Sequence, residues 1–144
     1  VVLNLSEGHK TVENLKARGA FTVGIADAAH MVEADYFGLV SGHQVPDKLG
    51  KAGLTATKAE MVDAPVINEL PLCMECEFVT YQDGSYGCGV IGKVVSVTAD
   101  ERVLTDGKVD MTKVDAIAFD PYTYGYYKVT ERVGNAFQDG AKLK

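Results

Sequence analysis

The alternation of apolar and polar positions divides the chain into short strands with a few helices between them. Six stretches have the period-two pattern, or the β-branched and aromatic content, that predicts strands: 1–5, 21–26, 54–62, 70–81, 87–99 and 124–133. Three stretches have helical spacing or capping residues: 11–18, 27–42 and 110–117. Short strands joined by turns predict a mainly β fold, a small antiparallel barrel or sandwich whose opening is covered by two or three short helices.

Local signals mark where several of these elements begin and end. Four residues are placed to cap or terminate helices: Thr11, Gly19, Asp27 and Asp110. Asp83-Gly84 predicts a hairpin turn between two long strands, and residues 105–108 predict a second turn. One helical turn is expected after Pro46, in the loop that follows the second helix. The second half of the chain is therefore expected to form an antiparallel meander.

The glycines of the sequence GCGVIG need a physical reason, because glycine weakens the interior of a strand. Gly87, Gly89 and Gly92 lie in a predicted strand. They mark either a bulge or corner of the barrel, which we favour, or a surface that a ligand approaches closely.

Three cysteines, Cys73, Cys76 and Cys88, are an odd number in a chain without a secretory signal, so reduced thiols are expected. Cys73 and Cys76 form a CxxC motif, but the motif lies inside a predicted strand. Positions i and i+3 of a strand point to opposite faces. Without a bulge the two thiols cannot share a metal ion or form a redox pair, and we predict no metal site.

Composition narrows the possible partners. The chain has 144 residues, 47% of them apolar and 24% charged, with a net charge of −6, which is typical of one globular domain. Scattered acidic residues argue against nucleic acid or an anionic membrane as the main partner. No apolar run is long enough to cross a membrane, and the first residues lack the basic region of a signal peptide, so the cytoplasm is expected.

One short stretch, SEGHKT, is a candidate anion site. It places Ser6, Gly8, His9, Lys10 and Thr11 immediately before a predicted helix. The first turn of a helix has unpaired N–H groups and a partial positive charge, and it attracts phosphate. Alternatively, Thr11 is only an N-cap, and the residues alone do not decide between the two.

Five stretches, in order, resemble the flavin-reductase-like domain, the FMN-binding split barrel of flavoredoxins and of the reductase components of some monooxygenases. They are 6–25, 41–55, 63–78, 90–110 and 126–134. The resemblance implies a split β-barrel of Greek-key type across residues 1–144. It also implies a homodimer with FMN at or near the subunit interface.

The resemblance also implies a phosphate site. In the family, the segment that matches 6–11 holds the flavin phosphate, and a second matching loop lies at 41–48. The candidate cofactor-binding residues are therefore Ser6, Gly8, His9, Lys10, Thr11, Ser41, Gly42 and Lys48. His9 and His43 stand where the family commonly has basic residues such as arginine. A histidine cannot form the two parallel hydrogen bonds to phosphate that an arginine guanidinium forms. Because histidine loses its charge near pH 6.5, phosphate affinity is expected to fall as the pH rises through about that value.

Family members normally have further strands before the segment that matches residues 1–8, and those strands contact the flavin. We therefore expect a fragment or processed form, an omitted N-terminal portion, or a barrel closed by a partner subunit. An open edge also favours dimerisation.

The expected activity is that of a flavin reductase, with NAD(P)H as electron donor and FMN as cofactor. Two alternatives stay open: an electron-transfer flavoprotein that does not turn over nicotinamide, and a flavin-free scaffold. His9, His30 and His43 form no evident pair with a nucleophile, so hydrolase chemistry is disfavoured and no catalytic residue is assigned. Tyr126 or Tyr127 could pack near a flavin, although a structural role at the edge of the barrel is favoured.

Overall fold

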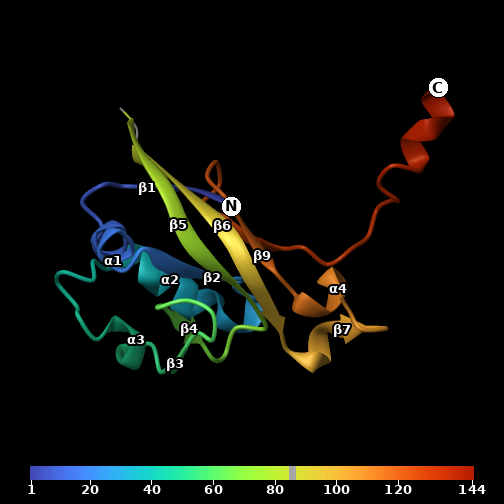
Figure 1. Ribbon diagram of the computed structural model, residues 1–144. Coiled ribbons are helices and arrows are strands. Elements are labelled where there is room, and N and C mark those ends of the chain that lie inside the picture. Colours follow the sequence, from blue (N-terminus) through green and yellow to red (C-terminus); the bar gives the residue numbers. More distant parts are fainter. Residues whose placement is uncertain (85–86) are drawn as a thin grey trace.

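The centre of the molecule is a twisted antiparallel sheet (Figure 1). The structure is a computed structural model that describes residues 1–84 and 87–144. In spatial order the strands of this sheet are β1 (Val2–Leu5), β6 (Gly87–Ala99), β5 (Leu72–Gly84) and β2 (Ala20–Gly24). The long hairpin of β5 and β6 runs across the whole body of the protein and positions the other elements.

Smaller elements surround this sheet. In the described part of the chain, three two-stranded ribbons pair β3 (Ala56–Lys58) with β4 (Pro65–Ile67), β7 (Leu104–Thr105) with β8 (Lys108–Val109), and β9 (Ile117–Asp120) with β10 (Gly125–Lys128). The α-helices are α1 (Lys10–Arg18), α2 (Met31–Leu39), α3 (Lys48–Lys51) and α4 (Met111–Val114). Short 3₁₀ helices are η1 (Ala28–His30), η2 (Glu101–Val103) and η3 (Asp139–Leu143). Within the described residues, no helix combines the length and apolar character needed to span a membrane.

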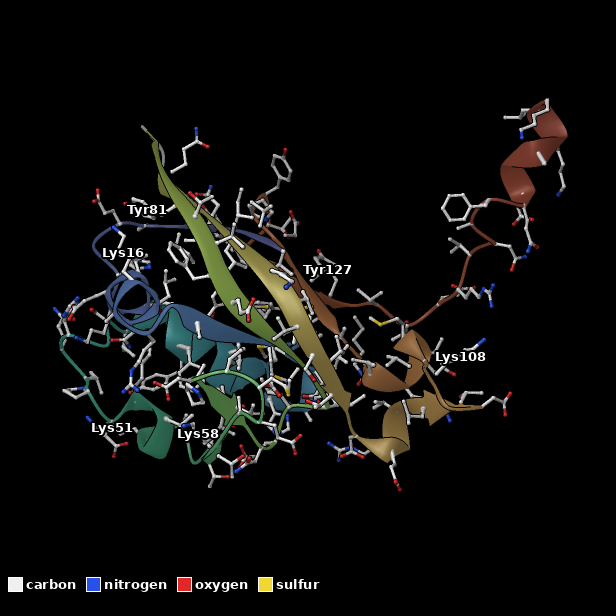
Figure 2. All side chains as sticks on the ribbon, viewed as in Figure 1. Lys16, Lys51, Lys58, Tyr81, Lys108 and Tyr127 are labelled. Carbon is white, nitrogen blue, oxygen red and sulfur yellow. The ribbon has the colours of Figure 1, made fainter. Side chains whose placement is uncertain are left out.

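Helix α1 is held against the sheet by one apolar stripe. Val12 and Leu15, three positions apart, are buried in a cluster with Phe21, Cys76 and Val90 from three different strands. This i, i+3 spacing places both helix side chains on one face. At the edge of this buried face, the Lys16 ammonium lies 3.5 Å from the centroid of the Tyr81 ring, which itself packs against the cluster (Figure 2). The first turn of α1 is thereby fixed relative to the sheet.

Gly92 is required by the packing of this cluster. A Cβ atom added at Gly92 would lie 2.3 Å from Cζ and 2.7 Å from Cε1 of Phe21. The ring of Phe21, rather than a ligand or a corner, therefore explains this glycine. Gly89 has no such neighbour, because its added Cβ would meet only the Gln82 carbonyl oxygen, at 3.9 Å. The surroundings of Gly87 lie outside the described residues.

Most of the predicted helix caps, helix ends and turns are confirmed. Gly19 ends α1 with a φ of 65°, and its N–H donates to the Leu15 carbonyl. The Asp27 carboxylate accepts the N–H of His30 at the start of η1, and the Asp110 carboxylate accepts that of Thr112 at the start of α4. The turn at 105–108 is also present, since residues 106 and 107 have φ values of 51° and 72°. These features depend only on neighbours in the sequence.

Other predictions were wrong at the ends of elements. Helix α1 begins two residues earlier than an N-cap at Thr11 implies, because His9 is at the N-cap and Lys10 is the first helical residue. Helix α2 ends at Leu39, because the next residue is already extended, and not at Gly42. The β5–β6 hairpin is present, but β5 continues through Gly84, and residues 85–86 between the two strands lie outside the described residues. Strands β4 and β9 fall in stretches that had no strand prediction, while β3 and β10 are shorter than predicted.

The CxxC cysteines point to opposite faces of β5. The register of β5 on β6 shifts between Glu75, opposite Ser96, and Cys76, opposite Val94. The extra residue at this shift is thus in β6, and alternation of side chains between Cys73 and Cys76 of β5 is preserved. Cys76 packs beneath α1, whereas the side chain of Glu75, on the other face, accepts the N–H of Met61 at 2.7 Å.

Both thiols are free and buried, and burial raises the pKa of Cys73 and of Cys76. Among the described residues, no three His, Cys, Asp or Glu side chains are arranged to hold a metal ion.

Candidate functional site

The start of α1, the end of α2 and the loop at 41–48 together enclose a cavity of about 570 Å³. Six of the eight residues predicted to bind the cofactor line it: His9, Lys10, Thr11, Ser41, Gly42 and Lys48. The remaining two, Ser6 and Gly8, do not line it in the described structure. Ser6 instead accepts the N–H of His9 with its carbonyl oxygen at 3.0 Å, which turns the chain into the helix.

The first turn of α1 offers backbone donors to this cavity. His9 has an extended backbone, and its side chain makes no capping hydrogen bond. Among the hydrogen bonds of the described residues, none is donated by the N–H of Lys10 or of Thr11. Unpaired N–H groups at the positive end of a helix dipole form an anion site. The local geometry therefore suits a phosphate group.

Lys10 is the cation closest to these donors, and it already has an anionic neighbour. Its ammonium donates to Glu13 at 2.5 Å, and the other carboxylate oxygen of Glu13 lies 3.8 Å from Nε2 of His43. The hydrogen bond from Lys10 is the main reason that the pKa of Glu13 lies below its usual range. An incoming phosphate would compete with this carboxylate for the same ammonium.

Gly42 brings the 41–48 loop into contact with the helix. A Cβ atom at this position would lie 3.1 Å from Cβ and 3.3 Å from Cγ of Lys10. This close approach explains why a glycine stands there, although α2 ends three residues earlier. It also fixes the aliphatic part of the Lys10 side chain at the wall of the cavity.

Lys48 holds the loop in place rather than presenting a free charge. Its ammonium donates to the carbonyl oxygens of Phe37, at 3.1 Å, and of Val40, at 3.2 Å, at the C-terminal end of α2. Cations are favourable at this end of a helix. Ser41 Oγ accepts the N–H of His43 at 3.2 Å, and Asp47 caps α3 by accepting the N–H of Gly50. The loop is therefore preorganised by its own polar groups.

Asn14 also lines the cavity and was missed from the sequence. Its position, one turn after Lys10 and Thr11, could have indicated it. Asn14 and Thr11 also line a neighbouring cavity of about 660 Å³ between α1, β2 and the β3–β4 ribbon. The Arg18 guanidinium forms an ion pair with Asp63, at 2.6 Å, at the wall of that second cavity.

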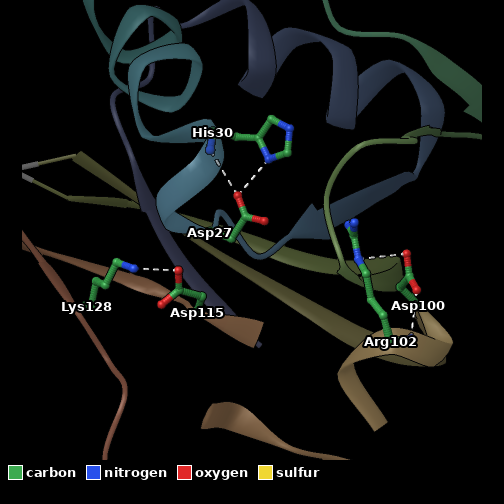
Figure 3. A network of polar contacts seen from close by, with 6 residues as sticks. All are labelled: Asp27, His30, Asp100, Arg102, Asp115 and Lys128. Carbon is green, nitrogen blue, oxygen red and sulfur yellow. Dashed lines mark hydrogen bonds and ion pairs between the residues drawn. The ribbon is translucent and has the colours of Figure 1, made fainter. Parts of the chain in front are cut away.

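An aspartate–histidine pair lies at the other end of α2 (Figure 3). Oδ1 of Asp27 is 2.6 Å from Nδ1 of His30 and also accepts the backbone N–H of that residue. Sequence reasoning did not find this pair. The neighbouring Ala28 N–H donates to the carbonyl oxygen of Asp115, whose carboxylate pairs with Lys128 at 2.7 Å. These contacts join η1 to the segment before β9, which is a structural role.

Tyr126 and Tyr127 do not line either cavity among the described residues. The Tyr126 hydroxyl donates to Asp35 of α2 at 2.8 Å, and this hydrogen bond raises the pKa of Tyr126. Its ring packs against Phe119, with a centroid distance of 5.4 Å. Tyr126 thus attaches the β9–β10 ribbon to α2.

Comparison with known proteins identifies the family. The sequence model described as "Flavin reductase like domain" matches residues 1–128. The flavoredoxin of Desulfovibrio vulgaris (Miyazaki F) is similar, with 35% identity and a TM-score of 0.90 over 96% of this chain and 74% of that one. So is the flavoredoxin from Methanosarcina acetivorans, with 28% identity and a TM-score of 0.90 over 99% and 75% of the two chains.

A third solved structure, nitrilotriacetate monooxygenase component B from Bacillus cereus, shares the fold, with 22% identity and a TM-score of 0.75 over 94% and 70% of the two chains. No curated protein sequence is significantly similar to this chain. The prediction of a mainly β, antiparallel split barrel is confirmed. With a family match over most of its length, the chain belongs to the flavin reductase-like domain family.

Proposed function

We propose that residues 1–144 form one FMN-binding domain that acts as an oxidoreductase, taking electrons from NAD(P)H and passing them to flavin or to a downstream acceptor. Membership of the flavin reductase-like family supports a flavin-related activity. The observation that carries the proposal is the cavity at the start of α1, where unpaired backbone donors and Lys10 face the Ser41-Gly42 loop.

The donor set of this cavity fits a phosphate monoester. The N–H groups of Lys10 and Thr11, the Thr11 hydroxyl and the Lys10 ammonium are all donors at one wall. Charge-assisted hydrogen bonds of this kind are the strong ones in phosphate recognition. Lys48 acts indirectly, because it orients the loop through the carbonyl groups of α2. FMN, when bound, supplies hydride and single-electron chemistry at its isoalloxazine ring.

A second candidate function is an electron-carrying flavoprotein that keeps its flavin bound and does not oxidise nicotinamide itself. The similarity to two flavoredoxins, one of them 35% identical, favours this alternative. The two candidates share the same phosphate site and differ in the electron donor. We further propose a homodimer and a cytoplasmic location.

The phosphate site is tested by titrating the protein with FMN and with riboflavin, which lacks the phosphate. The double variant Lys10→Ala/Thr11→Ala is expected to raise the dissociation constant for FMN about tenfold to hundredfold, since one or more charge-assisted hydrogen bonds are lost. Riboflavin affinity should stay unchanged. The matched control is Lys16→Ala, which removes an equal charge from the same helix at a position outside the cavity. Equal FMN affinity in all three proteins would refute the assignment.

The electron donor is tested by anaerobic spectroscopy of the flavin-loaded protein. Bleaching of the flavin absorbance by NADH or NADPH, at a rate that saturates with nicotinamide, is expected for a reductase. Bleaching by dithionite but by neither nicotinamide would instead support the carrier. Protein that stays colourless with excess FMN would support the flavin-free scaffold.

A further inference from the structure

The carboxylate of Glu13 lies between two basic side chains at the edge of the phosphate cavity. Its Oε1 accepts a hydrogen bond from the Lys10 ammonium at 2.5 Å, and its Oε2 lies 3.8 Å from Nε2 of His43. Lys10 belongs to the same turn of α1, whereas His43 comes from the 41–48 loop. Among the described residues, Glu13 is the carboxylate within ion-pair distance of His43. Glu13 therefore has two alternative cationic partners, one on each side.

His43 lies next to Glu13 but not at the wall of the cavity. Lys10 and His9 line the cavity, while neither Glu13 nor His43 is among its described lining residues. The His43 N–H donates to Ser41 Oγ at 3.2 Å, which fixes the backbone of the loop at this point. An anion in the cavity can thus affect the charge of His43 by changing what Glu13 contacts.

The contacts of Glu13 are of the kind that exchange readily. The side chains of Lys10, Glu13 and His43 have exposed fractions of 38%, 56% and 48%. Ion pairs that are open to water contribute little free energy, because solvent competes for both charges. The hydrogen bond from Lys10 is the main reason that the pKa of Glu13 lies below its usual range, so the carboxylate is ionised at neutral pH. When Glu13 loses Lys10, the neighbouring imidazole is the next available partner.

The other charged groups of the surrounding elements do not compete for this role. Lys48 donates to carbonyl oxygens at the end of α2, and Asp47 accepts an N–H at the start of α3. On α2, Asp35 accepts a hydroxyl group from β10. His9, just before α1, lines the cavity and is the other histidine that a bound phosphate could affect. The experiments below therefore have to separate His43 from His9.

We propose that Glu13 is a positioning residue that couples phosphate binding to protonation of His43. The phosphate of FMN takes the place of the Glu13 carboxylate on the Lys10 ammonium, and the carboxylate then pairs with His43. One proton passes from water to the His43 imidazole, and no bond to the phosphate is made or broken. The inference rests on the proposed function, since FMN is the phosphate ligand. It differs from a direct action of histidine charge on the phosphate, because the carboxylate transmits the effect.

Calorimetric titration with FMN in two buffers of different ionisation enthalpy measures the proton uptake. At about pH 7.5 an ordinary histidine is roughly one-tenth protonated, and a phosphate monoester is almost entirely the dianion, so the uptake reports the protein. We expect about 0.3–0.9 proton taken up per FMN bound, and the dissociation constant should then rise about twofold to eightfold per pH unit. Riboflavin, which has no phosphate to displace Glu13, should bind without uptake.

Three variants identify the groups that carry the proton. Glu13→Gln and His43→Gln should each abolish the uptake and make FMN affinity nearly independent of pH. The matched control is His9→Gln, which removes the histidine at the cavity wall and should keep the uptake, whatever its effect on affinity. All three side chains are exposed, so the variants should fold. Uptake that survives Glu13→Gln or His43→Gln, or that disappears in His9→Gln alone, would overturn the proposal.

Nuclear magnetic resonance locates the proton directly. The chain has three histidines, His9, His30 and His43, and the three variants His9→Gln, His30→Gln and His43→Gln assign their Cε1–Hε1 signals. Addition of FMN at about pH 7.5 should move the His43 signal to its protonated position and leave the other two in their original charge state. A protein that binds FMN without this shift refutes the coupling and leaves the FMN proposal standing. A protein that binds no FMN refutes both.

Discussion

Replacement of Gly92 by alanine should destabilise the protein through a single steric conflict. The added methyl group would lie 2.3 Å from Cζ and 2.7 Å from Cε1 of Phe21, and 3.4 Å from Cβ of Cys76. Carbon atoms in good contact are about 3.5–4.0 Å apart. The Phe21 ring therefore has to move by more than an ångström, within a cluster where Leu15 and Val90 are almost fully buried.

Overpacking of this kind costs about 1–3 kcal/mol. Part of it is offset, because alanine restricts the unfolded chain and contributes roughly 0.4–1 kcal/mol where its backbone is compatible. Because contacts of 2.3 and 2.7 Å are far too short, the overpacking cost is expected in the upper part of this range, about 2–3 kcal/mol, and the net loss for Gly92→Ala is then about 1–2.6 kcal/mol, which lowers the Tm by roughly 3–10 °C in a chain of this size. Gly89→Ala in the same strand is the control, since its methyl group would meet only a carbonyl oxygen at 3.9 Å.

Urea and thermal unfolding, followed by circular dichroism, measure both variants. Gly89→Ala should stay within about 0.5 kcal/mol of the wild type. Phe21→Leu should partly relieve Gly92→Ala, so the double variant should lose less than the sum of the single losses, with a coupling of at least about 0.5 kcal/mol. Equal Tm values for the two glycine variants, or strict additivity with Phe21→Leu, would refute the steric explanation.

Three further predictions follow from individual side chains. Glu13→Gln removes the carboxylate that competes for Lys10 and should tighten FMN binding by about two- to fivefold, with riboflavin affinity unchanged in the same titration; weaker FMN binding would contradict it. Burial raises the pKa of Cys73 and Cys76, so both should resist alkylation at pH 8 in the folded protein, as mapped by mass spectrometry. The same shift predicts stability that is present below the unfolded thiol pKa of about 8.5 and lost as the pH rises through the folded pKa. For Asp110, hydrogen bonds from threonine groups lower the pKa, so its contribution is present above about pH 4 and lost as the pH falls through the folded pKa. In Asp110→Asn the Tm should therefore fall less steeply as the pH is lowered below about 4. The same fall of Tm in the variant and the wild type would contradict the capping role.

The candidate site was only partly predictable. The resemblance to the family indicated eight residues, and the fold gathers six of them around one cavity, while Ser6 and Gly8 lie outside it in the described structure. Contacts decide the chemical character of two of the six, because the Lys10 ammonium pairs with Glu13 and that of Lys48 donates to carbonyl oxygens of α2. Lys48 is a plausible phosphate ligand in the sequence, yet the end of α2 occupies its ammonium.

The sequence by itself determined those features that depend only on residues close together in the chain. Gly19 ends a helix, Asp27 and Asp110 begin helices, and residues 105–108 turn, because each depends on side-chain and backbone chemistry within a few positions. The strand character of 70–81 and 87–99, with a turn signal at Asp83-Gly84 between them, likewise predicted the long central hairpin.

What only the tertiary structure decided depends on distant neighbours. Strands β4 and β9 exist because partners pair with them, and their three and four residues are too few to carry a periodic signal. Gly92 is required by the ring of Phe21, which is distant in the sequence, and Gly42 by the side chain of Lys10. Such packing is set by which surfaces meet in space, and no pattern within a short window of sequence specifies that.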